Sequence, residues 1–160
     1  MVAVHADLRV SYILNCMDRL PQSVRVTVGE GVIDPSALVA EVSRPDSGAT
    51  VLFLGTVRNH SNGRDGVTHL DYEVYEEFVE SKIGEVIAEA CAKWPVLAAA
   101  VEHRSGEVML GEASVAVAVA TAHRKDAFAA GEYIIDELKA RAPIWKKEYR
   151  PDGAEWSRGS

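Results

Sequence analysis

The chain has 160 residues, of which 48% are hydrophobic and 26% are charged, which is typical of an ordinary globular domain. Its formal net charge of −7 argues against a generally basic, nucleic-acid-binding surface, while leaving room for a local basic pocket. No stretch approaches the roughly 20 apolar residues of a membrane span. The apolar run VSYILNCM near the N-terminus lacks the basic start and the cleavage site of a secretory signal.

Strands and helices are predicted to alternate along the first half of the chain. Residues 23–30 (SVRVTVGE) alternate in polarity and indicate a strand. A helix is expected to follow, with Asp34 as its N-cap and Pro35 in its first turn. Residues 49–57 form a continuous apolar run, which predicts a buried strand, and the polar sequence RNHSNGRDG after it predicts a loop.

The second half continues the same alternation. Residues 67–75 are predicted to form a strand, and residues 76–94 a helix with one apolar stripe. Residues 98–122 indicate two strands around a glycine-containing turn. A last helix is expected over residues 125–141, and Pro143 ends it.

The domain organisation is predicted to be simple. There is no internal repeat and no linker, so residues 23–157 are expected to form a single domain and residues 1–22 an N-terminal extension outside it. Cys16 and Cys91 have neither metal-binding spacing nor the density of a disulfide framework, which suits a reducing, cytoplasmic environment. Cys91 is interpreted as a structural residue of its helix.

Two segments are candidates for anion binding. In GTVRNH, a buried strand leads directly to Arg58, whose guanidinium can bind a phosphate or carboxylate through two hydrogen bonds. In TAHRKDAF, His123 and Arg124 stand where a helix begins, and free N–H groups there favour anions. The alternatives are a solvated loop arginine in the first case and an ordinary helix cap by Thr121 or Asp126 in the second.

The sequence PIWKKEY adds a further group of cations. Lys139 lies at the border of the inward-facing stripe of the last helix, where a lysine either extends into water or points into a cleft. Trp145 can anchor the segment that follows, which would hold Lys146 or Lys147 near Lys139. Two neighbouring ammonium groups favour an anionic ligand between them, although an ordinary basic rim remains the alternative.

The order of these blocks along the chain is more informative than any one of them. FLGTVRNHSNG, LDYEVYEEF, HRSGEVMLGEASVAVAVATAHRKDAF, ELKARAPIWKKE and DGAEW together resemble the large, catalytic subunit of molybdopterin synthase. The resemblance spans residues 23–156. It implies an α+β fold of the hammerhead type, with mainly antiparallel sheet and flanking helices.

The resemblance also implies a sulfurtransferase reaction. In that family, cyclic pyranopterin monophosphate (precursor Z) receives two sulfur atoms and becomes the dithiolene of molybdopterin. Each sulfur arrives as a thiocarboxylate on the C-terminal Gly-Gly tail of a small ubiquitin-like subunit. The large subunit forms a homodimer, and one small subunit docks at each end to give a heterotetramer. Because the sulfur donor is a protein, neither a metal nor another cofactor is expected.

The family's functional positions can be carried over to this sequence. Lys139 and Lys146 match its catalytic lysines, and they also belong to its substrate-binding set. The remaining positions expected to bind substrate or anions, in part across the dimer interface, are Arg58, His123, Arg124, Lys147 and Glu148.

Two other functions are compatible with parts of the pattern. A non-catalytic, anion-binding paralogue could still dock a ubiquitin-like tail, although it would not need both Lys139 and Lys146. A phosphate-ester hydrolase using His123 would lack a positioned nucleophile or metal set. Near the C-terminus, Arg158 is a candidate replacement for basic contacts that some relatives make with a longer tail.

Overall fold

The computed structural model describes residues 23–61 and 63–157. The proposed N-terminal extension, Cys16 and Arg158 lie outside the described residues. The helices are α2 (Pro35–Val42), α3 (Glu76–Lys93) and α4 (Arg124–Arg141). The strands are β1 (Ser23–Gly29), β2 (Ala49–Thr56), β3 (His60–Ser61), β4 (Arg64–Asp65), β5 (His69–Val74), β6 (Val96–Arg104), β7 (Gly106–Met109), β8 (Ala113–Thr121), β9 (Ile144–Arg150) and β10 (Gly153–Ser157).

Two four-stranded sheets form the framework. The first has the order β1-β6-β8-β2, in which β1 runs parallel to β6 and the other pairs are antiparallel. The second has the order β10-β9-β5-β7 and is antiparallel throughout. The predicted α+β fold with mainly antiparallel sheet is thereby confirmed.

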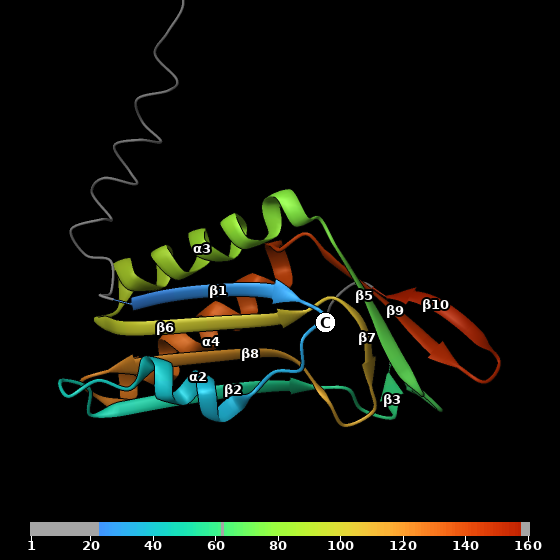
Figure 1. Ribbon diagram of the computed structural model, residues 1–160, viewed down its shortest axis with the longest axis horizontal. Helices are drawn as coiled ribbons and strands as arrows, with labels where there is room; N and C mark the ends of the chain where they lie inside the picture. The colour runs from blue at the N-terminus through green and yellow to red at the C-terminus, as the bar shows by residue number, and fades with distance from the viewer. Residues whose placement is uncertain (1–22, 62, 158–160) are drawn as a thin grey trace, which may run out of the picture.

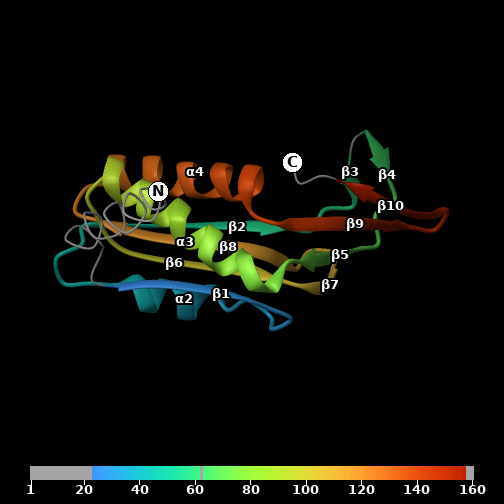
Figure 2. The ribbon, with the colours of Figure 1, turned by 90° about the horizontal axis from the view of Figure 1, so that it is seen from above.

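The first sheet lies between helices on both faces. Figure 2 shows α4 on one face and α2 on the other, and α3 packs on the same face as α4. Strand alternation sorts the side chains by size: the valines of β8 face α3 and α4, and its alanines face α2. The small alanine side chains let Leu38 and Val42 of α2 pack closely against the sheet, and both are 1% exposed.

The second sheet extends the molecule beyond one end of the first, as Figure 1 shows. The predicted two strands over residues 98–122 are in fact three, because the chain turns twice. At Gly106, φ is 70°, and at Gly111 it is 83°, a left-handed conformation that glycine adopts without a Cβ clash. Between these turns β7 leaves the first sheet and pairs with β5 in the second.

Most helices and strands begin and end within a residue or two of the bounds predicted from the sequence. Asp34 caps α2, since its Oδ1 accepts hydrogen bonds from the N–H groups of Ser36 (2.9 Å) and Ala37 (3.2 Å). The predicted loop after β2 contains the short β3–β4 hairpin. Cys91 is buried on α3, in agreement with a structural role.

No helix within the described ranges is long and apolar enough to cross a membrane.

A bidentate ion pair joins α3 to the end of α4. Nη1 and Nη2 of Arg141 each donate to the carboxylate of Glu89 at 2.8 Å, and the Tyr133 hydroxyl donates to it at 2.7 Å. The hydrogen bond from Arg141 is the main reason that the pKa of Glu89 falls from 4.5 to about 2. This pair holds the C-terminal turn of α4 in place.

The substitution Glu89→Gln is expected to lower the free energy of unfolding at pH 7 by about 1 kcal/mol, because water screens a pair that is about one-third exposed. The depressed pKa in the folded state means that the stabilisation is complete above about pH 4.5 and disappears as the pH falls towards 2. Urea unfolding of both proteins at several pH values tests this. An equal difference at pH 7 and pH 2 would contradict it.

Candidate active site

A cavity of about 360 Å³ opens where the two sheets meet the end of α4. Its walls come from the end of β2 and the following loop, from β5, β6, β8 and β9, and from the last turn of α4. The lining residues are Gly55, Thr56, Val57, Arg58, His60, Ser61, Val67, Leu70, Tyr72, His103, Ser114, Val115, Leu138, Lys139, Ala142, Ile144, Lys146 and Glu148.

Arg58 reaches the cavity because the chain before it is fixed. The N–H of Val57 donates to the carbonyl of Glu112 at 3.0 Å, and the Val57 carbonyl accepts from the N–H of Gly111 at 2.8 Å. These two bonds hold the end of β2 against the β7–β8 turn. Arg58 follows immediately and is exposed, so its guanidinium is free to meet an anion at the cavity mouth.

Lys139 and Lys146 line the same cavity from different elements. Lys139 is an exposed residue in the last turn of α4, and the side chain of Lys146 on β9 is only 15% exposed. Beyond α4 the chain forms β9, a strand that was not predicted from the sequence, and β9 pairs with both β5 and β10.

The strand conformation of β9 separates the two adjacent lysines. Successive side chains of a strand point to opposite faces, so Lys146 and Glu148 face the cavity and Lys147 does not. The Lys147 ammonium lies 5.5 Å from the ring centroid of Tyr149 and 5.4 Å from that of Trp156. Lys147 is therefore in cation–π contact with aromatic rings outside the cavity.

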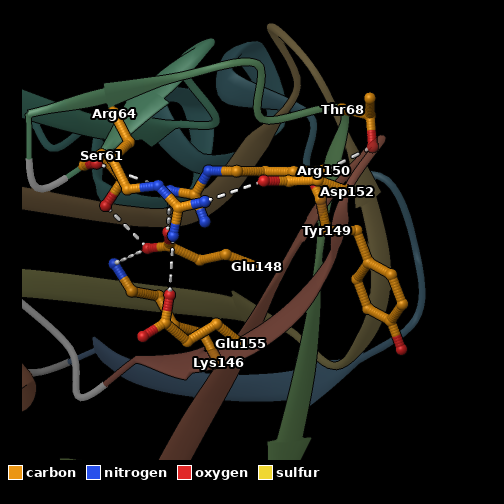
Figure 3. A network of polar contacts seen from close by, with 9 residues as sticks. All are labelled: Ser61, Arg64, Thr68, Lys146, Glu148, Tyr149, Arg150, Asp152 and Glu155. Atoms are coloured by element: carbon orange, nitrogen blue, oxygen red, sulfur yellow. Dashed lines mark hydrogen bonds and ion pairs between the residues drawn. The ribbon is translucent and has the colours of Figure 1, made fainter.

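A buried polar network fixes the floor of the cavity (Figure 3). The carboxylate of Glu148 accepts hydrogen bonds from Ser61 Oγ at 2.7 Å and from Arg150 Nη2 at 2.8 Å. The Lys146 ammonium lies 3.6 Å from the same carboxylate. Because Glu148 is 2% exposed, these partners replace the water that a carboxylate would otherwise bind.

The protonation state of Glu148 follows from these contacts. Burial by itself raises the pKa of Glu148, but the hydrogen bonds from Ser61 and Arg150 and the charge of Lys146 outweigh burial. The net pKa lies below the ordinary value for glutamate, so the group is an anion at neutral pH. The charge of Glu148 is balanced by its contacts inside the protein. The cavity lining remains cationic through Arg58, Lys139 and Lys146.

His123 and Arg124 lie away from this cavity within one chain. Both are exposed at the start of α4, and Lys139 is 15 residues further along the same helix, about 22 Å at 1.5 Å per residue. Neither of the predicted capping alternatives occurs: the helix begins without a side-chain cap, and Thr121 donates to the His123 carbonyl at 2.8 Å.

Several polar residues of the cavity wall were not predicted from the sequence. Ser61, Tyr72, His103 and Ser114 come from different strands and meet only in the folded chain. One signal was available: the apolar run of β6, residues 96–101, ends in the titratable residues Glu102, His103 and Arg104. Over residues 23–61 and 63–157, no group of three or more His, Cys, Asp or Glu side chains is arranged to hold a metal ion.

Comparison with known proteins shows which family the chain belongs to. A family model described as "MoaE protein" matches residues 28–141. The chain is 49% identical over 128 residues to the molybdopterin synthase catalytic subunit of Thermoplasma volcanium, an alignment covering 80% of this chain and 93% of that relative. The chain belongs to the MoaE family. The resemblance inferred from the sequence blocks is thus confirmed.

Solved structures agree with this assignment. The crystal structure of molybdopterin synthase from Staphylococcus aureus has a TM-score of 0.76 and 34% identity, covering 81% of this chain and 94% of that one. The complex of subunits 1 and 2 of molybdopterin-converting factor from Helicobacter pylori has a TM-score of 0.66 at 23% identity, covering 84% and 90%. The second likeness shows a shared fold.

The substitution Glu148→Gln is expected to destabilise the protein by about 3 kcal/mol, because it leaves the charges of Arg150 and Lys146 without their buried counter-charge. Chemical denaturation at pH 7 measures this effect. Glu155→Gln is the matched control: both side chains of its pair with Arg64 are more than half exposed, so it should change stability by no more than about 0.5 kcal/mol. Similar losses in both variants would show that the Glu148 network does not carry the predicted stability.

Proposed function

We propose that this chain is the catalytic subunit of a molybdopterin synthase. It would transfer sulfur from the C-terminal thiocarboxylate of a small ubiquitin-like subunit to cyclic pyranopterin monophosphate (precursor Z), forming the dithiolene of molybdopterin. The observation that carries this proposal is the cavity where Arg58, Lys139 and Lys146 meet, in a chain that belongs to the MoaE family. We further propose that residues 23–157 form one domain and act in the cytoplasm.

The chemistry of the substrate matches the charge of the cavity. A cyclic phosphate is an anion, and the guanidinium of Arg58 suits it through paired hydrogen bonds. The ammonium of Lys146, whose side chain is largely buried, would hold the pterin or the partner's tail, with Glu148 fixing its position. Glu148 acts through Lys146 in this proposal, since its carboxylate oxygens already have protein partners. Lys147, outside the cavity, has no assigned part in the transfer.

Lys139 would assist the sulfur-transfer step. When a thiocarboxylate sulfur attacks an electrophilic carbon of the substrate side chain, a C–S bond forms and negative charge develops on the group displaced from that carbon. An ammonium at the cavity wall can stabilise that charge or donate a proton to it. Water then cleaves the acyl–sulfur bond, which releases the partner's tail as a carboxylate and leaves sulfur on the pterin.

The proposal includes a homodimer with one small subunit docked at each end. Within one chain, α4 separates Arg124 from Lys139 by about 22 Å, so these two residues cannot share a ligand of pterin size in a monomer. A second copy would bring His123 and Arg124 to the cavity of its partner. The site would then be complete only in the dimer.

The substitution Lys139→Ala should abolish molybdopterin formation from precursor Z and a thiocarboxylated partner, because charge on the displaced group is no longer stabilised. Partner binding and the unfolding midpoint should change little, since Lys139 is exposed. Lys82→Ala, which removes an exposed lysine paired with Glu85 on α3, is the control and should keep activity. Near-normal turnover by Lys139→Ala would remove its catalytic assignment.

Incubation of precursor Z with the purified chain discriminates the alternatives. A hydrolase would change the substrate without a partner, and a non-catalytic paralogue would leave it unchanged even with thiocarboxylated partner. A synthase subunit should form product only when the partner is present.

Mixing two inactive variants tests whether the dimer shares its site. If Arg124 of one copy serves Lys139 of the other, a mixed dimer of Lys139→Ala and Arg124→Ala chains contains one intact site. Random assortment should then restore roughly a quarter of the wild-type activity. If both residues served the same site within one chain, every site would carry a defect and mixing would restore nothing.

A further inference from the structure

His103 occupies an unusual place for a titratable side chain. It lies near the end of β6, between Glu102 and Arg104 and after an apolar run over residues 96–101, and it pairs there with Val115 of β8. Only 5% of the residue is exposed, yet it belongs to the wall of the cavity. A buried imidazole that opens only into a binding cavity can meet only what enters that cavity.

One hydrogen bond decides which ring nitrogen carries the proton. His103 Nδ1 lies 2.8 Å from the backbone carbonyl oxygen of Arg104. A carbonyl oxygen can only accept, so Nδ1 bears the hydrogen and Nε2 carries a lone pair. Burial lowers the pKa of His103 to about 4, against the smaller opposite effect of the Arg104 carbonyl. The ring is therefore neutral at pH 7.

The neighbouring hydroxyl groups do not use this lone pair. The ring of Tyr72 meets the imidazole edge to face, with centroids 5.1 Å apart. Its hydroxyl donates to Ser114 Oγ at 3.1 Å, and Ser114 Oγ donates to the Gly55 carbonyl at 3.3 Å. Across the described part of the chain, Nε2 has no hydrogen-bond partner, and it is not among the fully buried atoms that lack one.

The rest of the lining makes this unpaired acceptor significant. Arg58, Lys139 and Lys146 can only donate hydrogen bonds, and they attract any small anion. Both carboxylate oxygens of Glu148 already accept bonds from the protein. A neutral imidazole acceptor adds a requirement that cations cannot impose, since it binds only a ligand that offers a hydrogen-bond donor at that position.

We propose that His103 Nε2 accepts a hydrogen bond from a ring N–H of the ligand and so selects an N–H-bearing heterocycle over other phosphate esters. This inference rests on the proposed function and deepens it, because a reduced pterin carries ring N–H donors as well as the anionic phosphate. His103 is then a specificity-determining residue of the cavity.

Two substitutions separate the two ring nitrogens. Asn at position 103 can keep the donor that bonds the Arg104 carbonyl but removes the acceptor in the cavity. Gln places its amide near the former Nε2 and keeps an acceptor there. The variant His103→Asn should weaken binding of precursor Z roughly tenfold to hundredfold, because a ligand donor loses its partner on desolvation. His103→Gln should recover most of that loss.

Titration calorimetry with precursor Z and steady-state kinetics with the thiocarboxylated partner measure the effect. The KM should rise in His103→Asn while kcat stays nearly constant, since the contact holds the ligand before and during reaction. Binding of inorganic phosphate should be unchanged in both variants. His69→Asn, which replaces a histidine stacked on Tyr149 outside the cavity, is the matched control and should behave as wild type.

Nitrogen-15 NMR of the His103 imidazole tests the inference on the protein without any substitution. The Nε2 resonance should be that of an unprotonated nitrogen, and precursor Z should shift it, whereas inorganic phosphate should not. An unmoved resonance, or equal affinity of wild type and His103→Asn, overturns the inference while leaving the proposed function intact. Absence of product from the wild-type chain with its partner would instead overturn the proposed function.

Discussion

The buried carboxylate of Glu148 is the constraint on which the candidate site depends. A cavity that binds an anion needs cations, yet cations that are partly removed from water repel one another and lose hydration. Glu148 reduces this repulsion because its carboxylate contacts both Lys146 and Arg150 and also accepts a hydrogen bond from Ser61. Its single charge offsets the most deeply placed cations and leaves Arg58 and Lys139, nearer the opening, for a ligand.

The strand geometry of β9 decides which side chains take part. Lys146 and Glu148 are two residues apart on a strand, so they share a face, and the network between them follows from the two-residue period. The pairing of β9 with β5 and β10 sets the face that is turned to the cavity. Lys147 has the same chemistry as Lys146 but contacts Tyr149 and Trp156 instead.

Under the proposed function, the cavity combines two kinds of recognition. Cationic donors bring in an anion from a distance and tolerate many phosphate esters, since charge attraction has little directional demand. The neutral imidazole of His103 acts at short range and requires a donor at one point. Its tautomer is set by a backbone carbonyl, so the protein fixes this acceptor before any ligand arrives.

The sequence by itself determined the elements with strong local signals and the family. Asp34 and Pro35 located α2, apolar stripes located α3 and α4, and the ordered blocks from GTVRNH to PIWKKE identified the molybdopterin synthase relatives. These features depend on neighbours a few residues away, which a single sequence displays directly. Their detection needed no knowledge of how the sheets meet.

Only the tertiary structure decided what gathers around the cavity. The β7 strand and the conversion of PIWKKEY into β9 depend on pairing with β5, a partner 34 to 80 residues away in sequence, and local propensity carries little information about such pairing. Contacts between residues far apart in sequence also bring Ser61 to Glu148 and the Tyr72 ring to His103. The candidate cationic residues were thus predictable from the sequence. Which of them share a cavity, and which neutral side chains lie beside them, depends on the fold.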